Sequence, residues 1–294
     1  MGARAARVVT KAGTEMPSQR RALTRADHRV LAEELLDATR QRRPLEPLSE
    51  RYRQLTVADA SRIRDMVLAC RLASGERLIG ATVSLAPPPP AGHRTGAEPR
   101  LGWLTDAMLL SNGTVQSERL IAPRVEAKLA FTVSRTVRRP IATVGDLLAS
   151  TYRVFPCLEV IDSRYGRDRL SAADDIADNC GAACLVLGRG VPPPAEGHVR
   201  RTQLRFEVDG AGPEGTRAAL DCPPEATLWL GNRWIATAGE LLPGTLLTAA
   251  AAAPAVPLAP GVRVAASFSA IGSVELQVAR ALRGRVGGAA HGTG

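Results

Sequence analysis

Two stretches of the chain place acidic residues among apolar ones, and the first of them alternates apolar and charged residues with a period of two. They are residues 123–131, with the sequence PRVEAKLAF, and residues 155–164, with the sequence FPCLEVIDSR. Side chains on a strand point alternately to opposite faces, so Glu126 and Lys128 share one face of the first strand. Glu159 lies opposite its apolar neighbours on the second strand. The pattern predicts a β-rich core with an inward carboxylate, and such a carboxylate needs a partner.

Short runs typical of β-strands, bounded by Gly and Pro, follow one another from residue 120 to residue 278. They predict strands at 125–133, 154–161, 182–187, 203–208, 244–248 and 262–268, in addition to one at 78–85. Helices are predicted at 144–151 and around 171–178. This pattern is typical of the α+β class, with a mixed β-sheet and peripheral helices.

The N-terminal part has helical periodicity instead. Thr24 can cap a helix with apolar residues at 30, 31, 35 and 36, which should end before Pro44. A second helix should begin after Thr56, carry residues 63, 67, 68 and 72 on one apolar face, and end at Gly75. We therefore expect a flexible basic arm at 1–22, one domain at 23–283 and a flexible tail at 284–294. The domain divides into a helical part at about 23–76 and a β-rich part at about 77–283.

Composition sets the broad class of the protein. The chain has 294 residues, of which 45% are hydrophobic, and this excludes disorder throughout. The net charge of +9 is spread along the chain, aromatic residues make up 3%, and nucleic-acid motifs are lacking, so nucleic-acid binding is not expected. No apolar run reaches the roughly 18 residues needed to span a membrane, and the basic N-terminus lacks the apolar centre of a secretory signal. We expect a cytoplasmic protein.

The acidic stretches, together with the segments 175–179 (DIADN) and 185–188 (LVLG), resemble a known family. It is the 2-keto-4-pentenoate hydratase and 4-oxalocrotonate decarboxylase branch of the fumarylacetoacetate hydrolase-like superfamily. The resemblance extends from about residue 23 to about residue 278 and includes the closing segment Gly272-Ser273-Val274. It implies a mixed β-sandwich roll with an N-terminal helical part.

In this family the first acidic strand carries Glu-x-Glu and the second carries a further Glu, and together they hold Mg²⁺ or Mn²⁺. Glu126 and Glu159 match the first and third ligands, whereas Lys128 takes the place of the second. Three carboxylates suit a hard divalent cation. An ammonium group has no lone pair to offer and repels the metal.

We therefore hypothesise that the Lys128 ammonium lies between Glu126 and Glu159 and replaces the cation. On this hypothesis no metal cofactor is expected, Mg²⁺ or Mn²⁺ could bind only weakly, and the two glutamates are remnant ligands. The alternative is that position 128 has drifted in a site that is no longer used.

Other family positions also differ. The segment 80–85 (GATVSL) has Thr82 in place of the family's lysine, and Arg100 replaces an aspartate in the loop 97–102 (AEPRLG). The family's Gly-Ser-Cys-Thr, which helps to bind the substrate carboxylate, corresponds to Ala250–Ala253 here. Hydratase activity of the ordinary metal-dependent kind is therefore not expected.

The resemblance also marks candidate substrate-binding residues, which are Thr82, Arg100, Asp162, Arg164, Asp178 and Asn179. For the last four, the alternative role is to hydrogen-bond loops and strand ends. The loop at 87–101 closes over the substrate in the family, so Arg100 and His93 are candidates for contacts with an anionic ligand.

Glu126, Lys128 and Glu159 are the predicted catalytic residues. The predicted function is that of a divergent lyase-like enzyme that hydrates, dehydrates or decarboxylates a 2-oxo acid or a related enolisable carbonyl compound. Lys128 and Arg100 would stabilise an enolate or carboxylate while Glu126 or Glu159 transfers a proton. A Schiff base at Lys128 is less favoured, because flanking carboxylates favour the ammonium form.

The alternative function is a catalytically inactive subunit that binds or assembles with an active partner. The expected partners are a small anionic carbonyl substrate and either further copies of this chain or a related enzyme, in a homo-oligomer or hetero-oligomer.

Overall fold

The computed structural model describes residues 22–84, 99–167, 170–209, 217–219, 223–250 and 255–280. The predicted N-terminal arm, apart from Ala22, and the predicted tail at 284–294 lie outside the described residues. So do His93 and residues 251–253.

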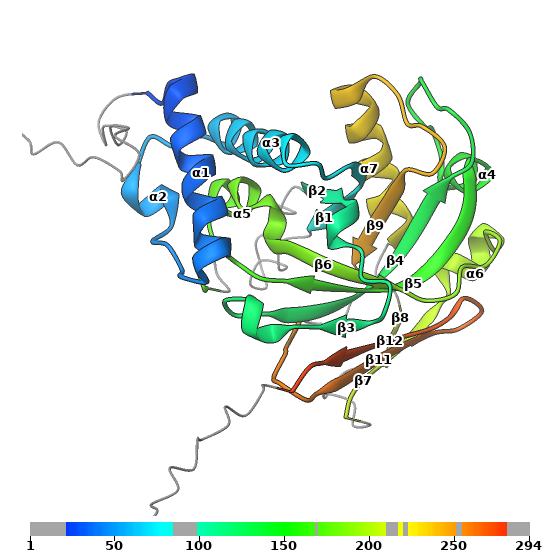
Figure 1. The fold of residues 1–294 in the computed structure, drawn as a ribbon. Coiled ribbons are helices and arrows are strands. Elements are labelled where there is room, and N and C mark those ends of the chain that lie inside the picture. The colour runs from blue at the N-terminus through cyan, green and yellow to red at the C-terminus, as the bar shows by residue number, and fades with distance from the viewer. Residues whose placement is uncertain are drawn as a thin grey trace, which may run out of the picture.

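Two β-sheets form the centre of the molecule (Figure 1). The larger has the strand order β2 (Arg100–Thr105), β1 (Leu78–Ser84), β9 (Leu246–Ala250), β4 (Arg124–Val133), β5 (Thr151–Ile161) and β6 (Ala182–Leu187), and β10 (Val256–Pro257) also pairs with β4. The smaller has the order β3 (Thr114–Val115), β12 (Gly272–Val278), β11 (Arg263–Phe268), β7 (Gln203–Val208) and β8 (Arg217–Ala219). Most neighbours are antiparallel, but β1 and β9 are parallel, so the larger sheet is mixed, as predicted.

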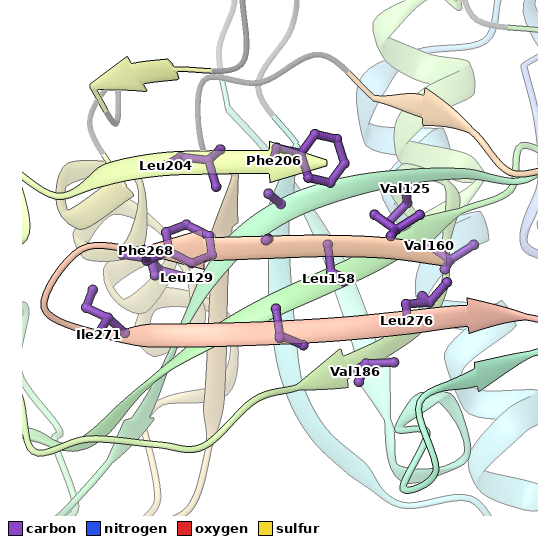
Figure 2. Close-up of a cluster of buried hydrophobic side chains, with 14 of the residues drawn as sticks. Val125, Leu129, Leu158, Val160, Val186, Leu204, Phe206, Phe268, Ile271 and Leu276 are labelled. Atoms are coloured by element: carbon purple, nitrogen blue, oxygen red, sulfur yellow. The ribbon is translucent and has the colours of Figure 1, made fainter. Parts of the chain in front are cut away.

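The largest apolar core lies between the two sheets (Figure 2). Leu129 and Leu158 enter it from β4 and β5, and Phe206 and Phe268 enter it from β7 and β11. All four side chains are at most 3% exposed, and burying a side chain of this size stabilises the fold by about 1.5–3 kcal/mol. Because β4 and β5 alternate in period two, this core forces Glu126, Lys128 and Glu159 onto the opposite face of the larger sheet.

A second apolar cluster lies on the same face of the larger sheet as this core, because its residues Leu247 and Ala249 of β9 pair with Phe131 and Leu129 of β4. The helix α7 (Pro223–Ala238) packs there on β1 and β9, with Leu230 fully buried and Trp234 in an edge-to-face contact with Trp103 at 5.3 Å between ring centres. This helix was not predicted, because runs typical of β-strands dominate residues 120–278. The signals were present: prolines open the helix, and apolar residues recur every four positions at 226, 230 and 234.

The other predicted elements agree with the structure in most cases. The N-terminal layer contains α1 (Arg25–Gln41), α2 (Leu48–Arg51), α3 (Val57–Ala73) and α5 (Ala172–Ala177), while α4 (Val144–Ala149) and α6 (Glu196–Arg200) lie in the β-rich part. The strand predicted at 244–248 is β9, two residues further on, and β2 was not predicted. Leu72 is 40% exposed, contrary to the predicted apolar face, because it follows Ile63 by nine positions, which is two and a half helical turns and places it on the opposite side of the helix. Among the described residues, no helix has the length and hydropathy to cross a bilayer.

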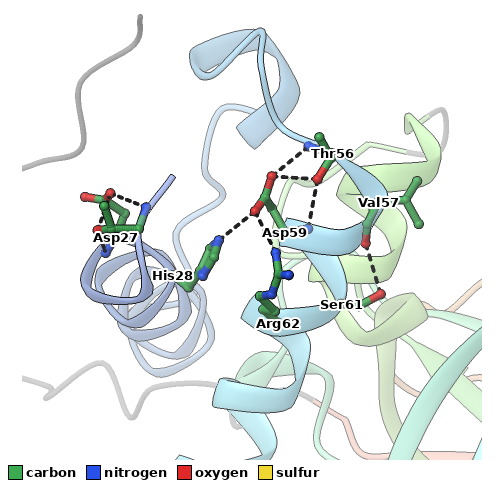
Figure 3. A network of polar contacts seen from close by, with 8 residues as sticks. Asp27, His28, Thr56, Val57, Asp59, Ser61 and Arg62 are labelled. Carbon is green, nitrogen blue, oxygen red and sulfur yellow. Dashed lines mark hydrogen bonds and ion pairs between the residues drawn. The ribbon is translucent and has the colours of Figure 1, made fainter. Parts of the chain in front are cut away.

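Buried polar contacts join α1 to α3 (Figure 3). Asp59 closes a capping box with Thr56 at the start of α3. The Oδ1 atom of Asp59 also lies 2.9 Å from the Nε2 atom of His28 in α1. Burial raises the pKa of Asp59, but the hydrogen bonds from Thr56 and His28 outweigh this effect and hold the pKa below its ordinary value. One carboxylate thus serves both the helix cap and the contact between the two helices.

Acidification should weaken this contact. Because the pKa of Asp59 is lower in the folded chain than in the unfolded chain, its contribution to stability is present above the unfolded pKa and is lost as the pH falls through the folded value. We expect the variant Asp59→Asn to lose less stability than the parent protein between about pH 6 and about pH 3. Urea denaturation across this range measures the difference. Equal losses of stability in the two proteins would contradict the stabilising role of the Asp59 carboxylate.

Candidate functional site

Strand register brings the candidate catalytic residues together. Glu126 lies directly opposite Glu159 in the antiparallel pair of β4 and β5. On the other side of β4, Lys128 pairs with Ala250 of β9, and Thr248 of β9 pairs in turn with Thr82 of β1. Four neighbouring strands therefore place Thr82, Thr248, Glu126, Lys128 and Glu159 around one point of the larger sheet.

The Lys128 ammonium lies between the two glutamates, where the sequence analysis placed it. Its Nζ atom is 3.1 Å from Oε2 of Glu159 and 3.4 Å from Oε2 of Glu126. It donates a hydrogen bond to the Thr82 hydroxyl at 2.8 Å and approaches the Val83 carbonyl at 3.5 Å. The side chain is 2% exposed. The cation is thus fixed in position by its partners and withdrawn from solvent.

These partners keep Lys128 charged. Burial alone lowers the pKa of the Lys128 amine, but the charges of Glu159 and Glu126 and the hydrogen bond to Glu159 outweigh it, and the net effect raises the pKa above its ordinary value. A protonated amine cannot attack a carbonyl group, so the Schiff-base route has no support in this arrangement.

Glu159 has two very different carboxylate oxygens. Oε2 accepts hydrogen bonds from the Thr82 hydroxyl at 2.9 Å and the Thr248 hydroxyl at 3.1 Å, in addition to its ion pair with Lys128. Oε1 is buried, and no described residue gives it a hydrogen-bond partner. Since Glu159 is fully buried, this second oxygen is an acceptor held inside the protein without a donor.

Glu126 is held much less firmly. Its side chain is 25% exposed, and within the described part of the chain its only polar contact is the 3.4 Å ion pair with Lys128. The cluster therefore has a buried inner carboxylate, a central ammonium and a partly exposed outer carboxylate.

Thr248 is a member of the site that the sequence analysis missed. The available signal was its spacing from Ala250, a residue at the family's substrate-binding segment, because positions two apart on a strand share a face. In addition, Thr248 was the last residue of the strand predicted at 244–248.

The described residues do not fit a divalent cation. Nowhere in the described ranges do three His, Cys, Asp or Glu side chains gather in a way that could hold a metal ion. At the position between Glu126 and Glu159, the Lys128 ammonium already takes up the negative charge that a metal would need.

Asp162, Arg164 and Asp178 form a separate network. The Asp162 carboxylate accepts hydrogen bonds from the backbone N–H groups of Ile121 and Ala122 at 3.0 and 2.7 Å. Arg164 forms a buried ion pair with Asp178, and its backbone N–H donates to the same carboxylate at 3.0 Å. Burial raises the pKa of Asp178 to about 7, although the Arg164 guanidinium acts to lower it. These contacts join loops and strand ends, and a role in substrate binding stays a prediction.

Asn179 and Arg100 also have partners within the protein. The Asn179 side chain accepts a hydrogen bond from the backbone N–H of Trp103 at 2.7 Å and donates one to the backbone carbonyl of Trp103 at 2.9 Å. A side chain at Gly102 would meet the Asn179 carbonyl oxygen at 2.6 Å, so this close approach requires glycine. Arg100 donates to Asp175 at 2.9 Å, and both side chains are 16% exposed. Its predicted contact with an anionic ligand would have to compete with Asp175.

Comparison with known proteins identifies relatives along most of the chain. The 2-hydroxyhexa-2,4-dienoate hydratase of Comamonas testosteroni is 32% identical over 248 residues, which cover 83% of this chain and 94% of the relative. The 2-hydroxypent-2,4-dienoate hydratase of Pseudomonas putida is 34% identical over 206 residues, covering 69% of this chain and 93% of the relative. No family model matches the chain.

Among solved structures, the 4-oxalocrotonate decarboxylase of Pseudomonas putida G7, complexed with magnesium and adipate, superposes with a TM-score of 0.78 and 25% identity. The match covers 88% of this chain and all of the decarboxylase chain. The predicted α+β fold is therefore confirmed, together with the family inferred from the two acidic strands. The chain belongs to the 2-keto-4-pentenoate hydratase and 4-oxalocrotonate decarboxylase family of the fumarylacetoacetate hydrolase-like superfamily.

Proposed function

We propose that this protein is a lyase that hydrates, dehydrates or decarboxylates a small 2-oxo acid, with the Lys128 ammonium in place of the divalent metal ion. The names of its relatives, dienoate hydratases and oxalocrotonate decarboxylases, support the reaction class. The observation that carries the metal-independent form is the Nζ atom of Lys128 between two carboxylates, 3.1 and 3.4 Å away.

The chemistry of 2-oxo acids requires a cation at this point. Removal of a proton next to the carbonyl carbon, or loss of CO₂, leaves an electron pair that becomes an enolate, with negative charge on the former carbonyl oxygen. A preorganised cation in a site withdrawn from water stabilises such charge more strongly than it would in bulk water. Lys128 would supply this cation at a fixed position.

Glu159 is the better candidate for proton transfer. Its Oε2 atom is occupied by Thr82, Thr248 and Lys128, whereas its Oε1 atom has no partner among the described residues. An unengaged oxygen can accept the substrate proton without first breaking a hydrogen bond. Thr82 and Thr248 would then be positioning residues that orient the carboxylate.

The direct test is turnover in the absence of metal. We expect the chelator-treated protein to convert 2-hydroxyhexa-2,4-dienoate, 2-hydroxypenta-2,4-dienoate or 4-oxalocrotonate, measured by the loss of ultraviolet absorbance of the conjugated substrate. Addition of Mg²⁺ should leave the rate unchanged. Strict dependence on added metal would contradict the role of Lys128. Lack of turnover with all three compounds, with and without metal, would favour the inactive-subunit alternative.

Substitution of Glu159 should remove activity. The variant Glu159→Gln retains the size and hydrogen-bonding capacity of the side chain but cannot take a proton, so we expect kcat to fall by about 100- to 10,000-fold. The matched control is Glu207→Gln, which changes the charge by the same amount on β7, in the other sheet. A Glu159→Gln variant that keeps more than a tenth of the parent rate would exclude Glu159 as the proton carrier.

The cytoplasmic location and the assembly into a homo-oligomer, or with a related enzyme, stay predictions from the sequence.

A further inference from the structure

The two carboxylates around Lys128 differ in how firmly they are held. Glu159 is 1% exposed in its side chain and is anchored by two threonine hydroxyls. Glu126 is 25% exposed, makes the longer contact of 3.4 Å, and has no other polar partner among the described residues. Glu126 is therefore the partner that can leave the ammonium at the lower cost.

The ammonium has no free hydrogen while Glu126 is in place. A lysine ammonium carries three N–H donors, and three partners surround it within 3.4 Å: the Thr82 hydroxyl and the two glutamates. A substrate anion can reach Nζ only if one of these partners moves. Thr82 and Glu159 also bond to each other, at 2.9 Å, which leaves Glu126 as the one that can be replaced.

We propose that Glu126 occupies the position of the substrate's negatively charged oxygen, and that a small carboxylate ligand binds by displacing it from Lys128. The ligand class is a 2-oxo acid, in keeping with the proposed function on which this inference rests. The exchange replaces one carboxylate by another at the ammonium, so the charge of the buried cluster stays the same. An added charge without a partner would carry a large desolvation cost, and the exchange avoids it.

Displacement also gives access to the proton acceptor. Glu126 and Glu159 lie directly opposite each other on adjacent strands, and Glu159 is fully buried in the arrangement described. When the Glu126 side chain turns toward solvent, a ligand held by Lys128 lies beside Glu159, whose Oε1 atom has no partner among the described residues. Glu126 thus covers the site until an anion takes its place.

This arrangement makes Glu126 an internal competitor of the ligand. The apparent affinity of a ligand is reduced by the fraction of molecules in the binding-competent state, and here that state is the one in which Glu126 has left Lys128. Removal of the charge at position 126 should therefore increase affinity, which is the opposite of what is expected for a residue that contacts the substrate favourably.

The test is calorimetric titration with pyruvate as the probe. We expect Glu126→Gln to bind pyruvate at least about tenfold more tightly than the parent protein, which corresponds to about 1.4 kcal/mol. Glu207→Gln is the matched control, because the Glu207 side chain is 24% exposed and the substitution changes the net charge equally. Its affinity should equal that of the parent. Unchanged or weaker binding by Glu126→Gln would overturn the proposal.

A second measurement observes the Lys128 ammonium directly. Lys11 and Lys128 are its only lysines, so a protein labelled with ¹⁵N-lysine gives two side-chain signals, which the variant Lys11→Arg assigns. Pyruvate should shift the Lys128 signal in the parent protein, and should do so at lower concentration in Glu126→Gln. A Lys128 signal that does not move in either protein would overturn the proposal independently of calorimetry.

The outcomes separate this inference from the proposed function. If Glu126→Gln binds pyruvate more tightly but the parent protein turns over none of the three substrates, displacement stands and the lyase function fails. If the parent protein is active and Glu126→Gln shows no gain in affinity, the lyase function stands and displacement fails.

Discussion

The variant Lys128→Met should lose about 3–5 kcal/mol of unfolding free energy, the usual cost of removing one partner from a buried ion pair. The cost arises because Glu159, fully buried, would lose the ammonium that is its ion-pair partner. Methionine has a similar length, so the effect of lost packing is small. Urea denaturation measures the change, and enzymatic turnover should disappear in the same variant.

The double variant Lys128→Met/Glu159→Gln tests the electrostatic origin of this loss. Since it removes both charges, we expect it to recover a large part of the lost stability. Lys11→Met is a control for the loss of a lysine charge elsewhere in the chain. If the double variant is as unstable as the sum of the two single variants, the loss would come from packing rather than from the unpaired carboxylate.

Replacing Lys128 by glutamate is expected to create a divalent metal site. The variant Lys128→Glu would hold three carboxylates together without a cation, which is the oxygen-rich arrangement that Mg²⁺ and Mn²⁺ prefer. We expect micromolar binding by the variant in isothermal titration, and none in that range by the parent protein. The melting temperature of the variant should also rise with added metal, because a ligand that binds only the folded state stabilises it.

A further substitution controls for binding elsewhere on the chain. The double variant Glu126→Gln/Lys128→Glu has one carboxylate fewer at the site and should lose most of the acquired affinity. Micromolar binding of Mg²⁺ or Mn²⁺ by the parent protein would contradict the idea that the ammonium replaces the metal ion.

Period-two alternation accounts for the part of the fold that the sequence predicted best. Leu129 and Leu158 had to face the core, so the charged residues of β4 and β5 had to lie on the other face, and the structure has this arrangement. Capping boxes at Thr24 and Thr56 likewise fixed the starts of two helices. The helix α7 was not predicted, because its opening prolines and its few apolar residues spaced by four lie among runs typical of β-strands.

The site was predicted less completely than the fold. Lys128 could be placed between Glu126 and Glu159, because all three share a face of neighbouring strands. Thr248 could not be assigned to the site in the same way, since its place depends on the pairing of β9 with both β1 and β4, which are distant in the chain. The different surroundings of the two Glu159 oxygens arise only from the final packing of four strands.

The contact between Asn179 and Trp103 has a consequence for solubility. The strand β2 is an edge of the larger sheet, and an exposed edge presents unpaired backbone groups that invite aggregation with another chain. The Asn179 side-chain amide forms hydrogen bonds with both the backbone N–H and the backbone carbonyl of Trp103, as a neighbouring strand would. A single side chain therefore closes the middle of this edge to intermolecular β-pairing.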